Sequence, residues 1–70
     1  MKGYSISGTV SRVDEKGWET VRQVPTFILY SNIQGIVSEG HAEHVGRWVV
    51  NPLGDKSLKV NLWAIEIDID

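Results

Sequence analysis

The segment from Leu58 to Asp70 constrains the fold of this chain more than any other, because it is apolar on both sides. Successive side chains of an extended strand point to opposite faces of the sheet. In a regular strand one face would carry Leu58, Val60, Leu62 and Ala64, and the other would carry Trp63, Ile65, Ile67 and Ile69. Either both faces of this strand are covered, or a bulge near Trp63 and Ala64 returns the isoleucines to a single face. We expect a strand over about residues 58–69.

The length and composition indicate one small domain spanning residues 1–70. The chain has 70 residues and no cysteine, so neither a disulfide framework nor a thiolate metal site stabilises it. Its start has no continuous apolar run of the kind found in signal peptides or membrane-spanning helices. We therefore expect a cytoplasmic protein without a membrane span. The formal net charge of −2 argues against a surface that binds phosphate backbones over its whole extent.

Alternating polar and apolar residues near the start predict a hairpin, with strands at about residues 3–13 and 18–30. Asp14 and Gly17 occupy the positions that they favour in a tight turn followed by a left-handed glycine. If Asp14 lies opposite Trp18, the register of the hairpin follows. It pairs Val10 with Arg22 and Ile6 with Thr26.

This register predicts a single buried face on the hairpin. Its members are Tyr4, Ile6, Val10, Trp18, Val24, Ile28 and Tyr30. Pro25 departs from the pattern, because proline has no N–H to donate to a neighbouring strand. We therefore expect the second strand to lie at a sheet edge there, or to bulge between Val24 and Thr26.

One helix is predicted over about residues 39–50, with Ser38 as its N-cap and Asn51-Pro52 ending it. Its apolar stripe consists of Ala42, Val45 and Val49, continued by Leu53, and Gly46 would let the helix approach the sheet closely. Residues 31–35 are expected to be a connector.

The elements in order predict a small α+β domain in ββαβ order, with a three-stranded, mainly antiparallel sheet and one helix on one face. The last strand then runs antiparallel to the first and parallel to the second. Two strand orders are compatible with this: the last strand lies beside the first, or it crosses over to lie beside the second.

The histidines of the helix are the only residues that suggest a metal or acid–base site. His41 and His44 are three positions apart, whereas the helical zinc motif His-Glu-x-x-His places its histidines four apart. We expect no metal and no cofactor. A nucleophile with an adjacent base and an orienting group cannot be assembled from the sequence, so we expect no enzyme.

A basic surface is the second candidate site. Arg12, Lys16 and Arg22 lie on the hairpin, and with Trp63 or Phe27 they would resemble the aromatic platforms that bind single-stranded nucleic acid. Asp14, Glu15 and Glu19 dilute the positive charge of this hairpin. Nucleic-acid binding is therefore the alternative function and not the favoured one.

The favoured function is a non-enzymatic, self-associating binding protein. If the last strand is regular, its outer apolar residues need cover. A homodimer or higher oligomer, or a contact with a larger assembly through the same residues, would supply it. The expected interface residues are Phe27, Leu29, Trp63 and Ile65, with Trp48 and His44 on the helix. In its compactness, its lack of cysteine and its single helix on a small sheet, the chain resembles short accessory proteins of bacteriophages and mobile elements. This resemblance implies that it acts on a host protein or a small ligand.

Overall fold

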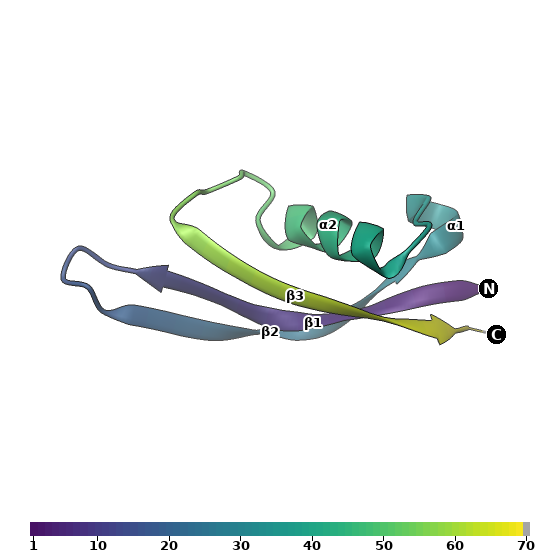
Figure 1. The fold of residues 1–70 in the computed structure, drawn as a ribbon, viewed down its shortest axis with the longest axis horizontal. Coiled ribbons are helices and arrows are strands. Elements are labelled where there is room, and N and C mark those ends of the chain that lie inside the picture. Colours follow the sequence, from purple (N-terminus) through teal and green to yellow (C-terminus); the bar gives the residue numbers. More distant parts are fainter. Residues whose placement is uncertain (70) are drawn as a thin grey trace.

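The computed structural model describes residues 1–69, and it has the predicted α+β architecture. The elements in order are β1 (Lys2–Val13), β2 (Glu19–Tyr30), α1 (Ser31–Gln34), α2 (Glu39–Val50) and β3 (Leu58–Asp68). The three strands form one antiparallel sheet in the order β2-β1-β3. Both helices lie on the same side of the sheet, and the hairpin of β1 and β2 extends well beyond them (Figure 1). We call the covered side of the sheet the helix face and the opposite side the outer face.

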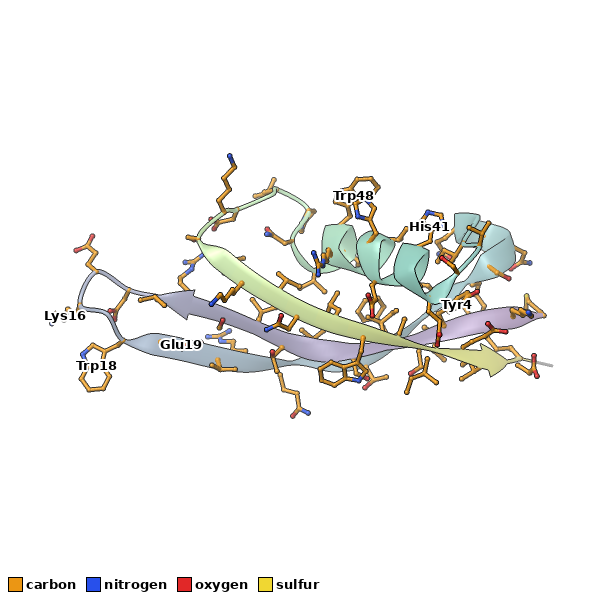
Figure 2. The ribbon with its side chains drawn as sticks, viewed as in Figure 1. Tyr4, Lys16, Trp18, Glu19, His41 and Trp48 are labelled. Carbon is orange, nitrogen blue, oxygen red and sulfur yellow. The ribbon has the colours of Figure 1, made fainter. Side chains whose placement is uncertain are left out.

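The turn between β1 and β2 forms as predicted. The Asp14 carboxylate accepts hydrogen bonds from the backbone N–H groups of Lys16 and Trp18, each at 2.9 Å. Gly17 has φ of 83°, a conformation that glycine adopts without steric cost. The predicted pairing of Val10 with Arg22 is confirmed. Trp18, however, points away from the helices at the hairpin tip (Figure 2) and is 71% exposed, so its predicted burial is wrong.

The register of β2 changes at Pro25, and this change overturns part of the predicted core. Gly8 pairs with Val24, but Ile6 pairs with Phe27 and not with Thr26, so β2 holds one more residue than β1 between these pairs. Such a bulge moves the following side chains to the other face. Phe27 and Leu29 consequently point to the helix face. Ile28 and Tyr30, which were predicted to be buried there, occupy the outer face.

Strand β3 lies beside β1 and is regular over its whole length. Its pairing with β1 continues without a slip from Lys2 opposite Asp68 to Arg12 opposite Leu58. The predicted antiparallel orientation of β3 to β1 is confirmed. Of the two possible strand orders, the structure has the one in which the last strand lies beside the first. The alternative of a bulge near Trp63 and Ala64 is wrong. The isoleucines of β3 therefore keep the face that strict alternation assigns to them.

Helix α2 has the predicted bounds, and the Ser38 side chain caps its first turn by accepting a hydrogen bond from the His41 N–H at 3.1 Å. The helix packs on the sheet through Ala42 and Gly46, which are both buried, with Val45 and Val50 beside them. The expectation that Val49 and Leu53 belong to this stripe is wrong, since both are exposed. A side chain at Gly46 would press on Ile6 and Leu62, so the glycine lets the helix lie close to the sheet.

The core beneath the helices is small. Its buried apolar members are Tyr4, Ile6, Leu29, Ile36, Ala42 and Leu62. The connector predicted over residues 31–35 contains the short helix α1, which ends at Gly35 with φ of 65°. The left-handed conformation of Gly35 ends the helix and redirects the chain, so that Ile36 lies in the core. No periodic pattern in the sequence predicts this burial. Only one face of the sheet is covered by these residues.

Candidate interaction surface

The outer face of the sheet carries a group of large apolar side chains near the ends of β2 and β3. Trp63 and Ile65 are 51% and 57% exposed, and Ile28 on the opposite edge of the sheet is 43% exposed. Tyr30, Ile67 and Ile69 are half-buried. We name this group the outer patch; it consists of Ile28, Tyr30, Trp63, Ile65, Ile67 and Ile69.

The middle strand separates the large apolar residues of the two edge strands. On the outer face β1 presents only small residues between the two edge strands, namely Gly3, Ser5 and Ser7. A methyl group on Gly3 would meet the side chains of both Ile28 and Ile69, which shows that these residues lie over the glycine from the two sides. The Ser7 hydroxyl is hydrogen-bonded to the Thr26 hydroxyl at 3.1 Å. Large apolar residues of β2 and β3 thus lie on both sides of small residues of β1.

The half of the outer face that holds the outer patch carries no charged side chain within residues 1–69. Its polar groups are the hydroxyls of Ser5, Ser7, Thr26 and Tyr30. Charged residues on this face occur only toward the hairpin, at Glu19 and Lys59. The centres of protein interfaces are depleted of charge and enriched in aromatic residues. The composition of this half of the face matches that description.

The six residues predicted to form an interface are in three separate places. Trp63 and Ile65 belong to the outer patch. Phe27 and Leu29 do not, because the bulge at Pro25 turns them into the core, where Leu29 is buried and Phe27 packs against its members. Ile28 takes their place on the outer face, and the sequence signal for this exchange is the proline itself.

Trp48 and His44 lie on α2, on the other side of the molecule. Their rings contact each other edge to face, with centroids 4.7 Å apart, and Trp48 projects away from the sheet (Figure 2). They are consequently not part of the outer patch. The structure does not bring these two residues together with Trp63 on one surface.

The second histidine of α2 is engaged in local structure. The Nδ1 atom of His41 accepts a hydrogen bond from the Val37 N–H at 3.3 Å, which helps to hold the chain ahead of the helix. Within residues 1–69, no three His, Asp or Glu side chains converge in the manner of a metal site.

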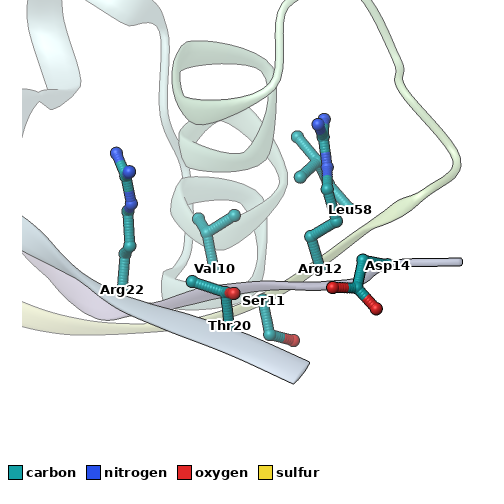
Figure 3. Close-up of a pocket in the computed structure, with 7 residues that line it drawn as sticks. All are labelled: Val10, Ser11, Arg12, Asp14, Thr20, Arg22 and Leu58. Atoms are coloured by element: carbon teal, nitrogen blue, oxygen red, sulfur yellow. The ribbon is translucent and has the colours of Figure 1, made fainter. Parts of the chain in front are cut away.

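The basic residues of the hairpin are divided between two locations. Lys16 stands at the tip of the hairpin (Figure 2). Arg12 and Arg22 project from the helix face of neighbouring strands, where they flank a groove of about 450 Å³ with Val10 and Leu58 (Figure 3). Trp63 is on the outer face and Phe27 is in the core, so the aromatic platform predicted for single-stranded nucleic acid is not assembled with these arginines.

The loop before β3 holds one of the two arginines in place. The Arg12 guanidinium donates to the Asp55 carboxylate at 2.9 Å. The same carboxylate accepts hydrogen bonds from the hydroxyl and the backbone N–H of Ser57. These two bonds, together with the charge of Arg12, lower the pKa of Asp55 below its ordinary value of 3.8. Asp55 is thus an ionised partner that orients Arg12 at the edge of the groove.

Comparison with known proteins gives no relative from which a function could be transferred. No protein-family model matches the chain, and no curated protein or solved structure is significantly similar to it. None of the helices in residues 1–69 has the length and apolar character needed to cross a membrane.

Proposed function

We propose that this protein is a non-enzymatic binding module that associates with a second copy of itself through the outer patch. The observation that carries this proposal is the unbroken register of β3 with β1. It keeps Trp63 and Ile65 on the face of the sheet that no helix covers. The second copy would cover that face in the way that α2 covers the other.

The small core supports the need for further burial. Among the large side chains of residues 1–69, Ile6 alone is completely buried. A domain of this size has only a few kcal/mol of stability from a single core. Burying a large apolar side chain is worth about 1.5–3 kcal/mol. Covering the outer patch would therefore add a contribution comparable to the stability of the isolated domain.

The shape and chemistry of the outer patch suit contact between identical surfaces. In a two-fold dimer the same patch faces itself, so a protrusion at one position must meet a depression at another. Trp63 lies opposite Ser7, and Ile65 lies opposite Ser5, so large and small residues adjoin across the outer patch. Trp63 of each copy would then lie against the serines of the other. Within the outer patch no charged side chain of residues 1–69 has to be removed from water to form this contact.

The dimensions of the sheet are adequate for a stable pair. Three strands of 11 or 12 residues, at about 3.3 Å per residue and about 4.8 Å apart, present a face of roughly 40 by 14 Å. A standard interface buries about 800 Å² of accessible surface on each partner. The whole outer face is of the same order. The outer patch occupies one half of it and would form the centre of the contact, with Glu19 and Lys59 toward its rim.

The oligomeric state tests the proposal directly. We expect multi-angle light scattering after gel filtration to give the mass of a dimer for the unmodified chain. Ile65→Lys should give a monomer, because a buried charge would then lie at the centre of the contact. Leu53→Lys is the matched control: Leu53 is 93% exposed in a loop away from the outer patch, so this variant should remain a dimer.

Native mass spectrometry of the unmodified chain is a second measurement that does not depend on the folding of a variant. A strictly monomeric species at concentrations of about 100 µM would contradict the proposal, since contacts of this size usually have lower dissociation constants. Equal loss of the dimer in both lysine variants would also contradict it. Dissociation by Ile65→Lys alone would support it.

A further inference from the structure

The groove on the helix face, between Arg12 and Arg22, is built from residues that the proposed self-association does not use. Val10 lies opposite Arg22, and Thr20 lies opposite Arg12. The two arginines are therefore diagonal neighbours on adjacent strands, with attachment points about 7–8 Å apart. Figure 3 shows both side chains rising on the same side of the sheet, with Val10 between them. Two guanidinium groups can consequently reach a single small group placed in the groove.

The two arginines differ in their partners. Arg12 is held by Asp55, which in turn is held by Ser57 and by a loop in which Asn51 and Asp55 exchange two hydrogen bonds, at 3.0 and 3.1 Å. A guanidinium has five N–H donors, so this contact leaves donors of Arg12 available. Within residues 1–69, Arg22 has neither a salt bridge nor a hydrogen bond to its side chain. The groove thus combines one oriented guanidinium with one uncompensated positive charge.

The remaining walls of the groove are suited to an apolar group. Val10 forms the floor between the arginines, and Leu58 closes the side toward β3. The volume of about 450 Å³ is within the range of small-molecule sites, about 300–1,000 Å³. Sites of this kind orient their ligand with a few polar groups and bury most of its surface against apolar ones.

We propose that this groove binds the phosphoryl group of a small molecule of nucleotide size. Guanidinium groups match phosphate oxygens with two parallel hydrogen bonds, and a tetrahedral phosphoryl group offers separate pairs of oxygens to two arginines at once. A planar carboxylate has only two oxygens, so it offers one such parallel pair and not two. The phosphoryl group would lie between Arg12 and Arg22, and the remainder of the ligand would lie on Val10 and Leu58.

A small ligand fits the surrounding charges better than a nucleic-acid strand does. Affinity for a strand requires several cationic groups along the path of its backbone. Asp14 lines the groove at the end toward the turn, where its carboxylate accepts hydrogen bonds from the N–H groups of Lys16 and Trp18. Beyond the groove the hairpin carries Glu15 and Glu19, and the one further cation of the turn, Lys16, is at the tip. A backbone that continued past the two arginines would meet these carboxylates, whereas one phosphoryl group between Arg12 and Arg22 would not reach Glu15 and Glu19.

Titration of the isotope-labelled full chain, followed by the backbone amide signals in NMR spectra, tests this proposal. Adenosine 5′-monophosphate should shift the signals of Val10, Arg22 and Leu58, whereas adenosine without the phosphate should not. Inorganic phosphate should shift the same signals and bind more weakly, because it lacks the part that lies on the apolar wall. Arg22→Gln should raise the dissociation constant of the monophosphate about tenfold or more.

Lys16→Gln provides the matched control, because it removes the same charge from the same hairpin outside the groove. It should change the dissociation constant by less than about twofold. Three results would overturn the proposal: no shift of the groove signals at millimolar nucleotide, equal weakening in the two variants, or binding of a single-stranded oligonucleotide with a steep salt dependence while the mononucleotide does not bind. The groove and the outer patch are on opposite faces, so this test is independent of the oligomeric state.

Discussion

Gly8 of β1 lies against the backbone of Leu62 in β3 so closely that no side chain fits between them. A methyl group on Gly8 would come within 2.8 Å of the Leu62 Cα and would collide with the carbonyl oxygen of Asn61. Gly8 pairs with Val24 of β2, and this pair directly adjoins the bulge in which β2 has one extra residue. The close approach of β1 and β3 and the bulge in β2 thus occur at the same level of the sheet.

Gly8→Ala should therefore destabilise the fold strongly. Backbone atoms of β3 cannot move aside as a side chain can, so we expect the free energy of unfolding to fall by about 3 kcal/mol or more. Urea unfolding followed by circular dichroism measures this change. Gly3→Ala is the comparison, since its methyl group would meet only side-chain atoms, those of Ile69 and Ile28, and no backbone. That variant should stay within about 1 kcal/mol of the unmodified chain, and equal effects of the two would disprove the close approach.

The bulge at Pro25 makes a prediction about neighbouring residues of β2. Leu29 is buried beneath the helices, so Leu29→Ala should cost about 3 kcal/mol in the free energy of unfolding. Val21 precedes the bulge and lies exposed on the outer face, so Val21→Ala should change it by less than about 0.5 kcal/mol. Without the bulge Leu29 would be on the outer face, and the two costs would be similarly small. Thermal or urea unfolding of both variants distinguishes these registers.

Self-association through the outer patch should make thermal stability depend on concentration. A contact that exists only in the folded state shifts the unfolding equilibrium by mass action. For a domain of this size we expect the midpoint of thermal unfolding to rise by about 3–5 °C for each tenfold increase in protein concentration. Differential scanning calorimetry at several concentrations measures this. Ile65→Lys should have a midpoint that does not change with concentration, and a constant midpoint in the unmodified chain would contradict the contact.

The bonds to Asp55 should make part of the stability depend on pH in the acid range. Ser57 and Arg12 lower the pKa of this carboxyl in the folded state, so the unfolded chain binds a proton more readily than the folded one. The stabilisation is complete above the ordinary value of 3.8 and is lost as the pH falls through the lower, folded value. Urea unfolding between about pH 6 and pH 2 should show a smaller acid loss for Asp55→Asn.

Asp68→Asn serves as the control for this measurement. Asp68 makes no hydrogen bond or salt bridge through its side chain within the described part of the chain. Its substitution should leave the acid slope of the unmodified protein nearly unchanged. If Asp55→Asn and Asp68→Asn gave the same slope, the network of Arg12, Asp55 and Ser57 would contribute nothing to stability in acid.

The local elements of this protein could be predicted because each depends on residues that are close in the sequence. Ser38 and Asn51-Pro52 mark the ends of α2, and Asp14 and Gly17 form the turn by hydrogen bonds that span four residues at most. The alternation of β3 places Trp63 and Ile65 on one side as long as the strand has no bulge. These features follow from capping, turn preference and the two-residue period of strands.

Only the tertiary structure determines which face of the sheet each side chain occupies, because this depends on the pairing of residues that are distant in the sequence. Pro25 signals an irregularity, but only the ladder with β1 determines where the extra residue sits, and that position sends Phe27 and Leu29 inward and Ile28 outward. The local sequence is equally compatible with a regular and a bulged β3, and the unbroken register with β1 distinguishes the two. Arg12 and Arg22 are ten positions apart in the sequence. They become diagonal neighbours because the hairpin pairs Val10 with Arg22 and Arg12 with Thr20. Side-chain direction across a sheet is a property of this non-local pairing, and local preference does not determine it.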